Sequence, residues 1–107
     1  MCGAVGFTAS DVPEKLGACH CEMCRRWTGS AFVNIEVPNE KINWTGKEHI
    51  ATLQSSDWAE RGWCSCCGTG LFWRMTEENE YSGTTDIALG LFDDPSGFKI
   101  SHEIYID

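Results

Sequence analysis

Basic side chains are scarce in this chain of 107 residues, which has 8 Lys and Arg against 16 Asp and Glu and a formal net charge of −8. Phosphate backbones and anionic membrane surfaces are therefore poor partners, so we expect no nucleic acid and no membrane partner. Long apolar runs are also missing, because none approaches the roughly 18–20 residues that a membrane-spanning helix requires.

Targeting and repeat signals are absent as well. The N-terminal MCGAVGF has no basic segment before an apolar run, so no signal peptide is recognisable. We find no internal repeat, low-complexity tract or linker, and a chain of this length fits one domain, which we expect over residues 1–107. A reducing, cytoplasmic location follows as an expectation, and the oligomeric state stays open.

Cysteine, by contrast, is abundant, with seven in the chain. An odd number cannot pair completely within one molecule, and without a secretion signal metal ligation is the natural interpretation of such a count. The thiols fall into two separate clusters. Seven thiols in this division are too few, and too neatly separated, for a metal store.

Turn signals recur about every eight to twelve residues, which is typical of an all-β domain built from short strands. We expect antiparallel sheets in a single domain, with one short helix over residues 21–28. The expected strands cover residues 4–9, 31–37, 41–44, 49–53, 70–75, 87–92 and 99–106.

The first cysteine cluster has the spacing C-x-C-x-x-C, formed by Cys19, Cys21 and Cys24. The x-x pair predicts a knuckle turn, and the C-x-C arm predicts an extended strand, so the three sulfurs converge on one point. Thiolates are soft donors that suit Zn²⁺. Three protein ligands leave an open fourth position, as in catalytic sites, whereas a fourth ligand from elsewhere would close the site into a structural one.

The second cluster is Cys64-x-x-Cys67 followed by glycine, which indicates a zinc knuckle because Gly68 allows the left-handed turn after the second ligand. A single knuckle supplies only two ligands, and Cys2 is the first candidate for a third. Cys66 has two interpretations, as the fourth ligand or as a small residue within the turn. A second Zn²⁺ here would link the N-terminus to the middle of the chain.

Four motifs occur in register along nearly the whole chain. They are Cys2-Gly3-Ala4-Val5, Ala18-Cys-His-Cys-Glu-Met-Cys-Arg-Arg-Trp-Thr-Gly29, Ala59-Glu-Arg-Gly-Trp-Cys-Ser-Cys-Cys-Gly-Thr69 and Gly90-Leu-Phe-Asp-Asp-Pro95. Together they resemble the family of glutathione-dependent formaldehyde-activating enzymes, which includes domains like that of centromere protein V. The resemblance implies a zinc-stapled fold of β-sheets called a β-tent.

The resemblance further implies a catalytic-type zinc at Cys19, Cys21 and Cys24, and a structural zinc held by Cys64, Cys67 and an N-terminal C-x-C. Cys2 matches the second cysteine of that C-x-C, and the first would lie before Met1. The implied reaction joins formaldehyde and glutathione into S-(hydroxymethyl)glutathione, a carbon–sulfur lyase chemistry. A non-catalytic zinc domain that binds a partner is the alternative, although this acidic chain lacks the basic extension expected of such relatives.

Two arginines directly follow the first cluster. Arg25 and Arg26 are candidates to bind a glutathione carboxylate, because a guanidinium can pair with a carboxylate in a bidentate fashion. The alternative is that they only offset the thiolate charge or face solvent. Asp93 and Asp94, next to a proline, are interpreted first as a turn and only second as a general base.

Overall fold

The computed structural model describes residues 2–10, 12, 15–78, 83–92 and 99–104. Short strands dominate these residues, and the helix α1 (Glu22–Thr28) is seven residues long. The strands are β1 (Gly6–Ala9), β2 (Lys15–Cys19), β3 (Phe32–Pro38), β4 (Ile42–Thr45), β5 (Ile50–Ser56), β6 (Ala59–Cys64), β7 (Gly70–Met75), β8 (Thr84–Ala88) and β9 (Lys99–Ile104). The predicted β fold is confirmed.

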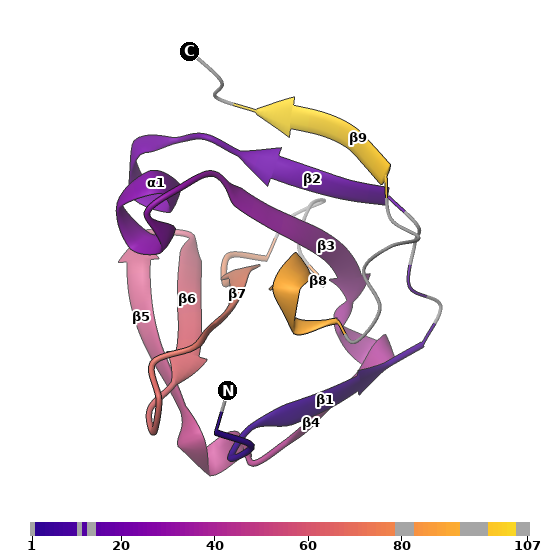
Figure 1. Ribbon diagram of the computed structural model, residues 1–107, viewed down its shortest axis with the longest axis vertical. Coiled ribbons are helices and arrows are strands. Elements are labelled where there is room, and N and C mark those ends of the chain that lie inside the picture. The colour runs from indigo at the N-terminus through magenta and orange to yellow at the C-terminus, as the bar shows by residue number, and fades with distance from the viewer. Residues whose placement is uncertain (1, 11, 13–14, 79–82, 93–98, 105–107) are drawn as a thin grey trace.

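Seven strands form one curved sheet in the order β5-β6-β7-β8-β3-β2-β9, and β1 pairs with β4 in a separate ribbon. Figure 1 shows the β1–β4 ribbon facing the larger sheet across the interior, with α1 at the corner where β2 gives way to β3. The sheets are antiparallel as expected, except that β2 and β9 run parallel. The chain therefore returns to pair its C-terminal strand beside β2.

The two faces of the large sheet differ in polarity. On β3, Ile35 and Val37 are fully buried and join Leu16 and Ile87 in the apolar core. Successive side chains of a strand point to opposite faces, so Glu36 projects from the other face of the sheet. Phe7 of β1 and Trp44 of β4 lie 5.3 Å apart by ring centroid, and both pack against the core. The ribbon thus covers the face of the sheet that carries this core, and Glu36 lies on the opposite face.

A glycine in β6 permits close packing against β7. Gly62 lies directly opposite Phe72 of β7, and a Cβ on Gly62 would fall 2.4 Å from the Phe72 ring. No side chain fits at that distance, so the ring of Phe72 covers the Gly62 backbone.

The strand expected over residues 87–92 is wrong in its bounds. The structure places β8 at Thr84–Ala88, followed by a 3₁₀ turn at Leu89–Leu91. The Phe92 N–H donates to the Leu89 carbonyl oxygen at 3.1 Å and closes this turn. The sequence stays apolar beyond the end of β8. A prediction from periodicity alone therefore placed the strand too far toward the C-terminus. Strand β6 was not predicted, because Glu60, Arg61 and Gly62 interrupt its apolar pattern.

Within the described part of the chain, no helix has the length and apolar character needed to cross a bilayer. The longest α-helix in that part is α1, which is far shorter than a membrane span requires.

Candidate functional site

The first cysteine cluster converges in space. Cys19 is the last residue of β2, Cys21 precedes α1, and Cys24 is in the first turn of that helix. Their three sulfur atoms all lie within 4.8 Å of one another, so this group, the thiol triad, could hold a metal ion. Cys24 is buried, whereas Cys19 and Cys21 are partly exposed. The triad is therefore covered by protein at Cys24 and partly accessible to solvent at Cys19 and Cys21.

The local sequence explains why α1 starts where it does. Cys21 is the N-cap, with an extended backbone, and its Sγ accepts a hydrogen bond from the Cys24 N–H at 3.4 Å. Gly29 ends the helix with φ of 79°, and its N–H donates to the Arg25 carbonyl oxygen at 2.8 Å. One short turn of helix therefore brings the second and third sulfurs to the same point.

A buried arginine supports the triad from the sheet. Arg61 on β6 is only 5% exposed, and its Nη1 donates to Cys24 Sγ at 3.5 Å. The guanidinium also lies 5.0 Å from the ring centroid of Trp27. A positive charge held this close favours thiolates over thiols in the triad. The contact of Arg61 with the triad was not predicted, because Arg61 is distant in the chain from Cys24.

The thiols of the triad differ in acidity when no metal is bound. Burial raises the pKa of Cys24 to about 12, although Arg61 acts in the opposite direction. Burial also raises the pKa of Cys19. For Cys21 burial acts upward too, but hydrogen bonds from the Cys24 N–H and from the neighbouring thiols, with the charge of Arg61, leave its pKa lowered. Cys21 is therefore the thiol most ready to ionise.

The triad forms part of the wall of a cavity of about 240 Å³. Trp58 and Trp73 pack edge to face along it, 5.6 Å apart by centroid, and Met23 and Trp58 are 49% and 44% exposed at the surface. We call this the thiol cavity. Its other lining residues are Ala18, Cys19, Cys21, Cys24, Phe32, Asn34, Glu36, Ser55, Ser56, Arg61 and Asp86.

The arginines predicted to contact substrate lie elsewhere. Arg25 and Arg26 are exposed on α1 and line a different surface hollow, not the thiol cavity. Arg25 Nε donates to the His20 carbonyl oxygen at 2.9 Å, and Arg26 pairs with Glu22 at 2.9 Å. Their contact with a glutathione carboxylate stays a prediction. Asp93 and Asp94 lie outside the described residues.

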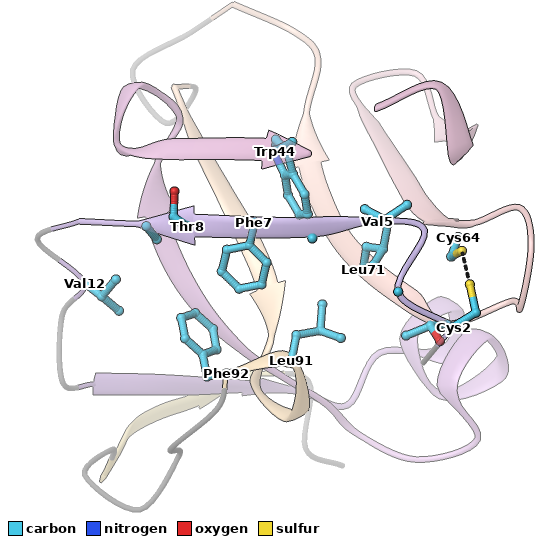
Figure 2. Close-up of a pocket in the computed structure, with 14 residues that line it drawn as sticks. Cys2, Val5, Phe7, Thr8, Val12, Trp44, Cys64, Leu71, Leu91 and Phe92 are labelled. Atoms are coloured by element: carbon cyan, nitrogen blue, oxygen red, sulfur yellow. Dashed lines mark hydrogen bonds between the residues drawn. The ribbon is translucent and has the colours of Figure 1, made fainter. Parts of the chain in front are cut away.

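The second cluster also converges. The sulfurs of Cys2, Cys64 and Cys67 lie within 4.8 Å of one another, and we call them the knuckle group. Figure 2 shows Cys2 and Cys64 meeting from the N-terminal segment and β6. Their sulfur atoms are 3.8 Å apart. This group could hold a second metal ion. Cys2 and Cys64 of this group also line a separate cavity of about 580 Å³ beneath β1, together with side chains such as Phe7 and Phe92.

The hairpin turn between β6 and β7 shapes the knuckle group. Gly68 has φ of 81°, and its N–H donates to the Cys64 carbonyl oxygen at 2.8 Å. Hydrogen bonds from Thr69 lower the pKa of Cys67 to about 5. Cys66 is exposed and does not belong to the group, and its Sγ lies 3.6 Å from His49 Nδ1. The structure therefore places Cys66 apart from the three converging sulfurs.

Asp86 is a feature of the thiol cavity that no motif indicated. It lies on β8, opposite Glu36 of β3, and burial together with the Glu36 charge raises its pKa from 3.8 to about 7. A polar residue between the buried Thr85 and Ile87 of an alternating strand was the available signal. Such a carboxyl is a candidate functional group in its own right.

The raised pKa of Asp86 predicts a pH-dependent stability. Between about pH 4 and pH 7 the folded chain keeps a proton that the unfolded chain has lost, so the free energy of unfolding falls as the pH rises through this window. We expect Asp86→Asn to stabilise the fold by on the order of a few kcal/mol at about pH 8, and by roughly half as much at about pH 5. Urea denaturation at both values measures this, and an equal effect at both would contradict it.

The whole chain, with its two converging sulfur groups, matches a known protein family. The family described as glutathione-dependent formaldehyde-activating enzyme matches residues 1–107 of the chain. The chain belongs to this family. The resemblance of the four motifs is thereby confirmed.

A curated relative carries a related name. An uncharacterized lyase of Schizosaccharomyces pombe is 35% identical over 82 residues, which are 76% of this chain and 59% of that protein. This formaldehyde-activating-enzyme family member therefore spans a little over half the length of that relative. A crystal structure of a Rhodobacter sphaeroides protein has the same fold, with a TM-score of 0.67 at 16% identity, and the match covers 86% of this chain and 83% of that one.

Zinc, which the family resemblance implies, fits the donors present in both groups. Thiolates that bind Zn²⁺ tetrahedrally at about 2.3 Å lie about 3.8 Å from one another. The Cys2–Cys64 sulfur separation is 3.8 Å, and the sulfurs of each group lie within 4.8 Å of one another. All the donors are cysteine sulfurs, which as thiolates favour zinc over magnesium or calcium.

Proposed function

We propose that this chain is a zinc-dependent carbon–sulfur lyase-type enzyme that acts on the adduct of a small thiol with formaldehyde or a related aldehyde. Glutathione is the thiol that the family name suggests. The observation that carries the proposal is the convergence of three sulfurs on the wall of a cavity of about 240 Å³.

Cys19, Cys21 and Cys24 would hold the catalytic zinc. A zinc ion held there would either lower the pKa of a bound substrate thiol toward neutral or polarise the aldehyde oxygen as a Lewis acid. An all-thiolate ligand set is electron-rich, which favours the first of these roles.

The apolar side chains of the cavity would bind and position the substrate. Trp58 and Trp73 offer an apolar wall that excludes water, and Met23 lies at the exposed margin. The guanidinium of Arg61 keeps positive charge beside sulfurs that become thiolates. A substrate thiolate arriving at the triad would meet the same field, which stabilises its negative charge.

The knuckle group would hold a structural zinc. Cys2 lies in the segment before β1, whereas Cys64 ends β6 and Cys67 lies in the turn that follows, so one ion would tie two distant parts of the fold. In this proposal residues 1–107 form one zinc-binding domain that acts in the cytoplasm.

Metal analysis followed by thiol titration tests the proposed function. Protein purified under reducing conditions should carry two zinc ions per chain, one of them labile to glutathione or a chelator. Exchange between free formaldehyde and S-(hydroxymethyl)glutathione, followed by NMR above the uncatalysed background, should be faster with the protein. Two equally inert ions and no added exchange would instead support a non-catalytic zinc domain.

Arg61 should set the zinc affinity of the triad. We expect Arg61→Met to weaken zinc binding there by about 10- to 100-fold, because it removes the donor and charge next to Cys24. Competition with a chromophoric chelator measures this affinity. The change should leave the zinc of the knuckle group in place.

Arg74 provides a matched control. Its guanidinium also covers an aromatic ring, 4.6 Å from the centroid of Phe72, but it pairs with Glu60 and does not line the thiol cavity. Arg74→Met should therefore leave the zinc affinity of the triad unchanged. An equal loss in both variants would show that Arg61 acts through general stability and not through Cys24.

A further inference from the structure

A row of side chains crosses the large sheet on the face of the thiol cavity. Glu36 lies opposite Asp86, Asp86 lies opposite Trp73, and Trp73 lies opposite Arg61. Directly opposite residues of antiparallel strands share a face, and all four line the thiol cavity. The row therefore starts with two carboxylates and ends with the arginine that contacts the triad.

Asp86 has no cationic partner among the described residues. Glu36 faces it from β3 and Trp73 faces it from β7, while Arg61 lies two strands away on β6 and is engaged by Cys24 and Trp27. Burial and the charge of Glu36 raise the pKa of Asp86 to about 7. Near neutral pH the Asp86 carboxyl is thus present in both protonation states, as efficient proton transfer requires.

We propose that Asp86 is the acid–base residue of the thiol cavity and that Glu36 is a positioning residue that keeps Asp86 able to hold a proton. This inference rests on the proposed function. Asp86 takes the proton of the incoming thiol and then gives it to the aldehyde oxygen.

The proton and electron balance closes within the site. As the sulfur–carbon bond forms, the π electrons of the carbonyl move to oxygen, and the proton held by Asp86 completes the hydroxyl group. In the reverse direction Asp86 removes the hydroxyl proton, the carbonyl re-forms, the sulfur–carbon bond breaks, and the thiol recovers the proton. Nothing is oxidised or reduced, and no further reactant is needed.

Three variants separate the roles. Asp86→Asn removes the titrating carboxyl, Glu36→Gln removes only the neighbouring charge, and Glu40→Gln removes an exposed carboxylate outside the cavity. The zinc-loaded proteins are compared by NMR exchange between formaldehyde and S-(hydroxymethyl)glutathione from about pH 5.5 to 9, with the uncatalysed exchange subtracted. Zinc content and circular dichroism check that each variant is folded.

Each variant has a distinct expected result. Asp86→Asn should lower the rate of catalysed exchange by about 100-fold or more. Its pH profile should also lack the inflection near neutral pH. Glu36→Gln should stay active, with the inflection moved to lower pH, because the like charge that raises the pKa of Asp86 is gone. Glu40→Gln should match the wild type in rate and profile.

A direct titration gives a readout that does not depend on activity. The side-chain carboxyl ¹³C signal of Asp86, assigned by its loss in Asp86→Asn, should titrate near neutral pH in the wild type and at lower pH in Glu36→Gln. An Asp86 carboxyl that titrates below about pH 5 in the wild type overturns the inference. If Asp86→Asn does not fold, the absence of any shift in Glu36→Gln overturns it as well.

Failure of the inference and failure of the proposed function look different. If the wild type shows no catalysed exchange, the proposed function fails, whatever the titration of Asp86. If the wild type is active and folded Asp86→Asn is equally active with the same pH profile, only the role of Asp86 fails. The proposed reaction would then stand without it.

Discussion

Replacing Cys67 with serine should lower the free energy of unfolding by on the order of several kcal/mol and release one zinc ion. The sulfurs of Cys2, Cys64 and Cys67 converge from segments more than sixty residues apart along the chain. A metal ion shared by them would bind the folded chain much more tightly than the unfolded one, because the unfolded chain does not hold the three sulfurs together. Loss of one ligand therefore weakens folding directly.

Cys66→Ser is the matched control for this experiment. Cys66 is the immediate neighbour in the same turn and makes the same chemical change, but its exposed sulfur lies outside the knuckle group. We expect it to keep both zinc ions and to change the free energy of unfolding by less than about 0.5 kcal/mol. Chemical denaturation with zinc quantified on the same samples measures both variants. A larger effect for Cys66→Ser would make Cys66 the ligand.

The cysteine spacing predicted which sulfurs meet within each local motif. C-x-C-x-x-C and C-x-x-C-G set short turns whose geometry is local, and the structure brings each of these groups together. Even the long-range contact of Cys2 with Cys64 was expected, because a knuckle leaves ligands to be supplied from elsewhere. The family motifs added the order of these pieces along the chain.

The polar side of the thiol cavity was not predictable in the same way. Arg61 and Asp86 reach the cavity only because β6, β7, β8 and β3 are neighbours in one sheet, and strand order is a long-range property that no local pattern encodes. The parallel pairing of β9 with β2 is of the same kind. Arg25 and Arg26 directly follow the cysteines in the sequence. Their side chains nevertheless do not line the cavity, because they lie on the exposed face of the helix.

Replacing Cys21 with serine should instead abolish activity and release one zinc ion, while the chain stays folded. Cys21 has two roles, as a predicted zinc ligand and as the N-cap of α1, where its Sγ accepts the Cys24 N–H at 3.4 Å. Serine is a good N-cap but a poor zinc ligand beside two thiolates. The substitution therefore keeps the helix start and removes only the soft donor.

We expect Cys21→Ser to reduce catalysed formaldehyde–glutathione exchange by about 100-fold or more, since a catalytic metal contributes several kcal/mol to transition-state stabilisation. Zinc should fall from two ions to one per chain, and the free energy of unfolding should change by only about 1 kcal/mol. The contrast with Cys67→Ser decides between the two sites. If both variants unfold alike, the triad is a second structural staple, and if Cys21→Ser keeps both zinc ions and full exchange, the triad is not the catalytic centre.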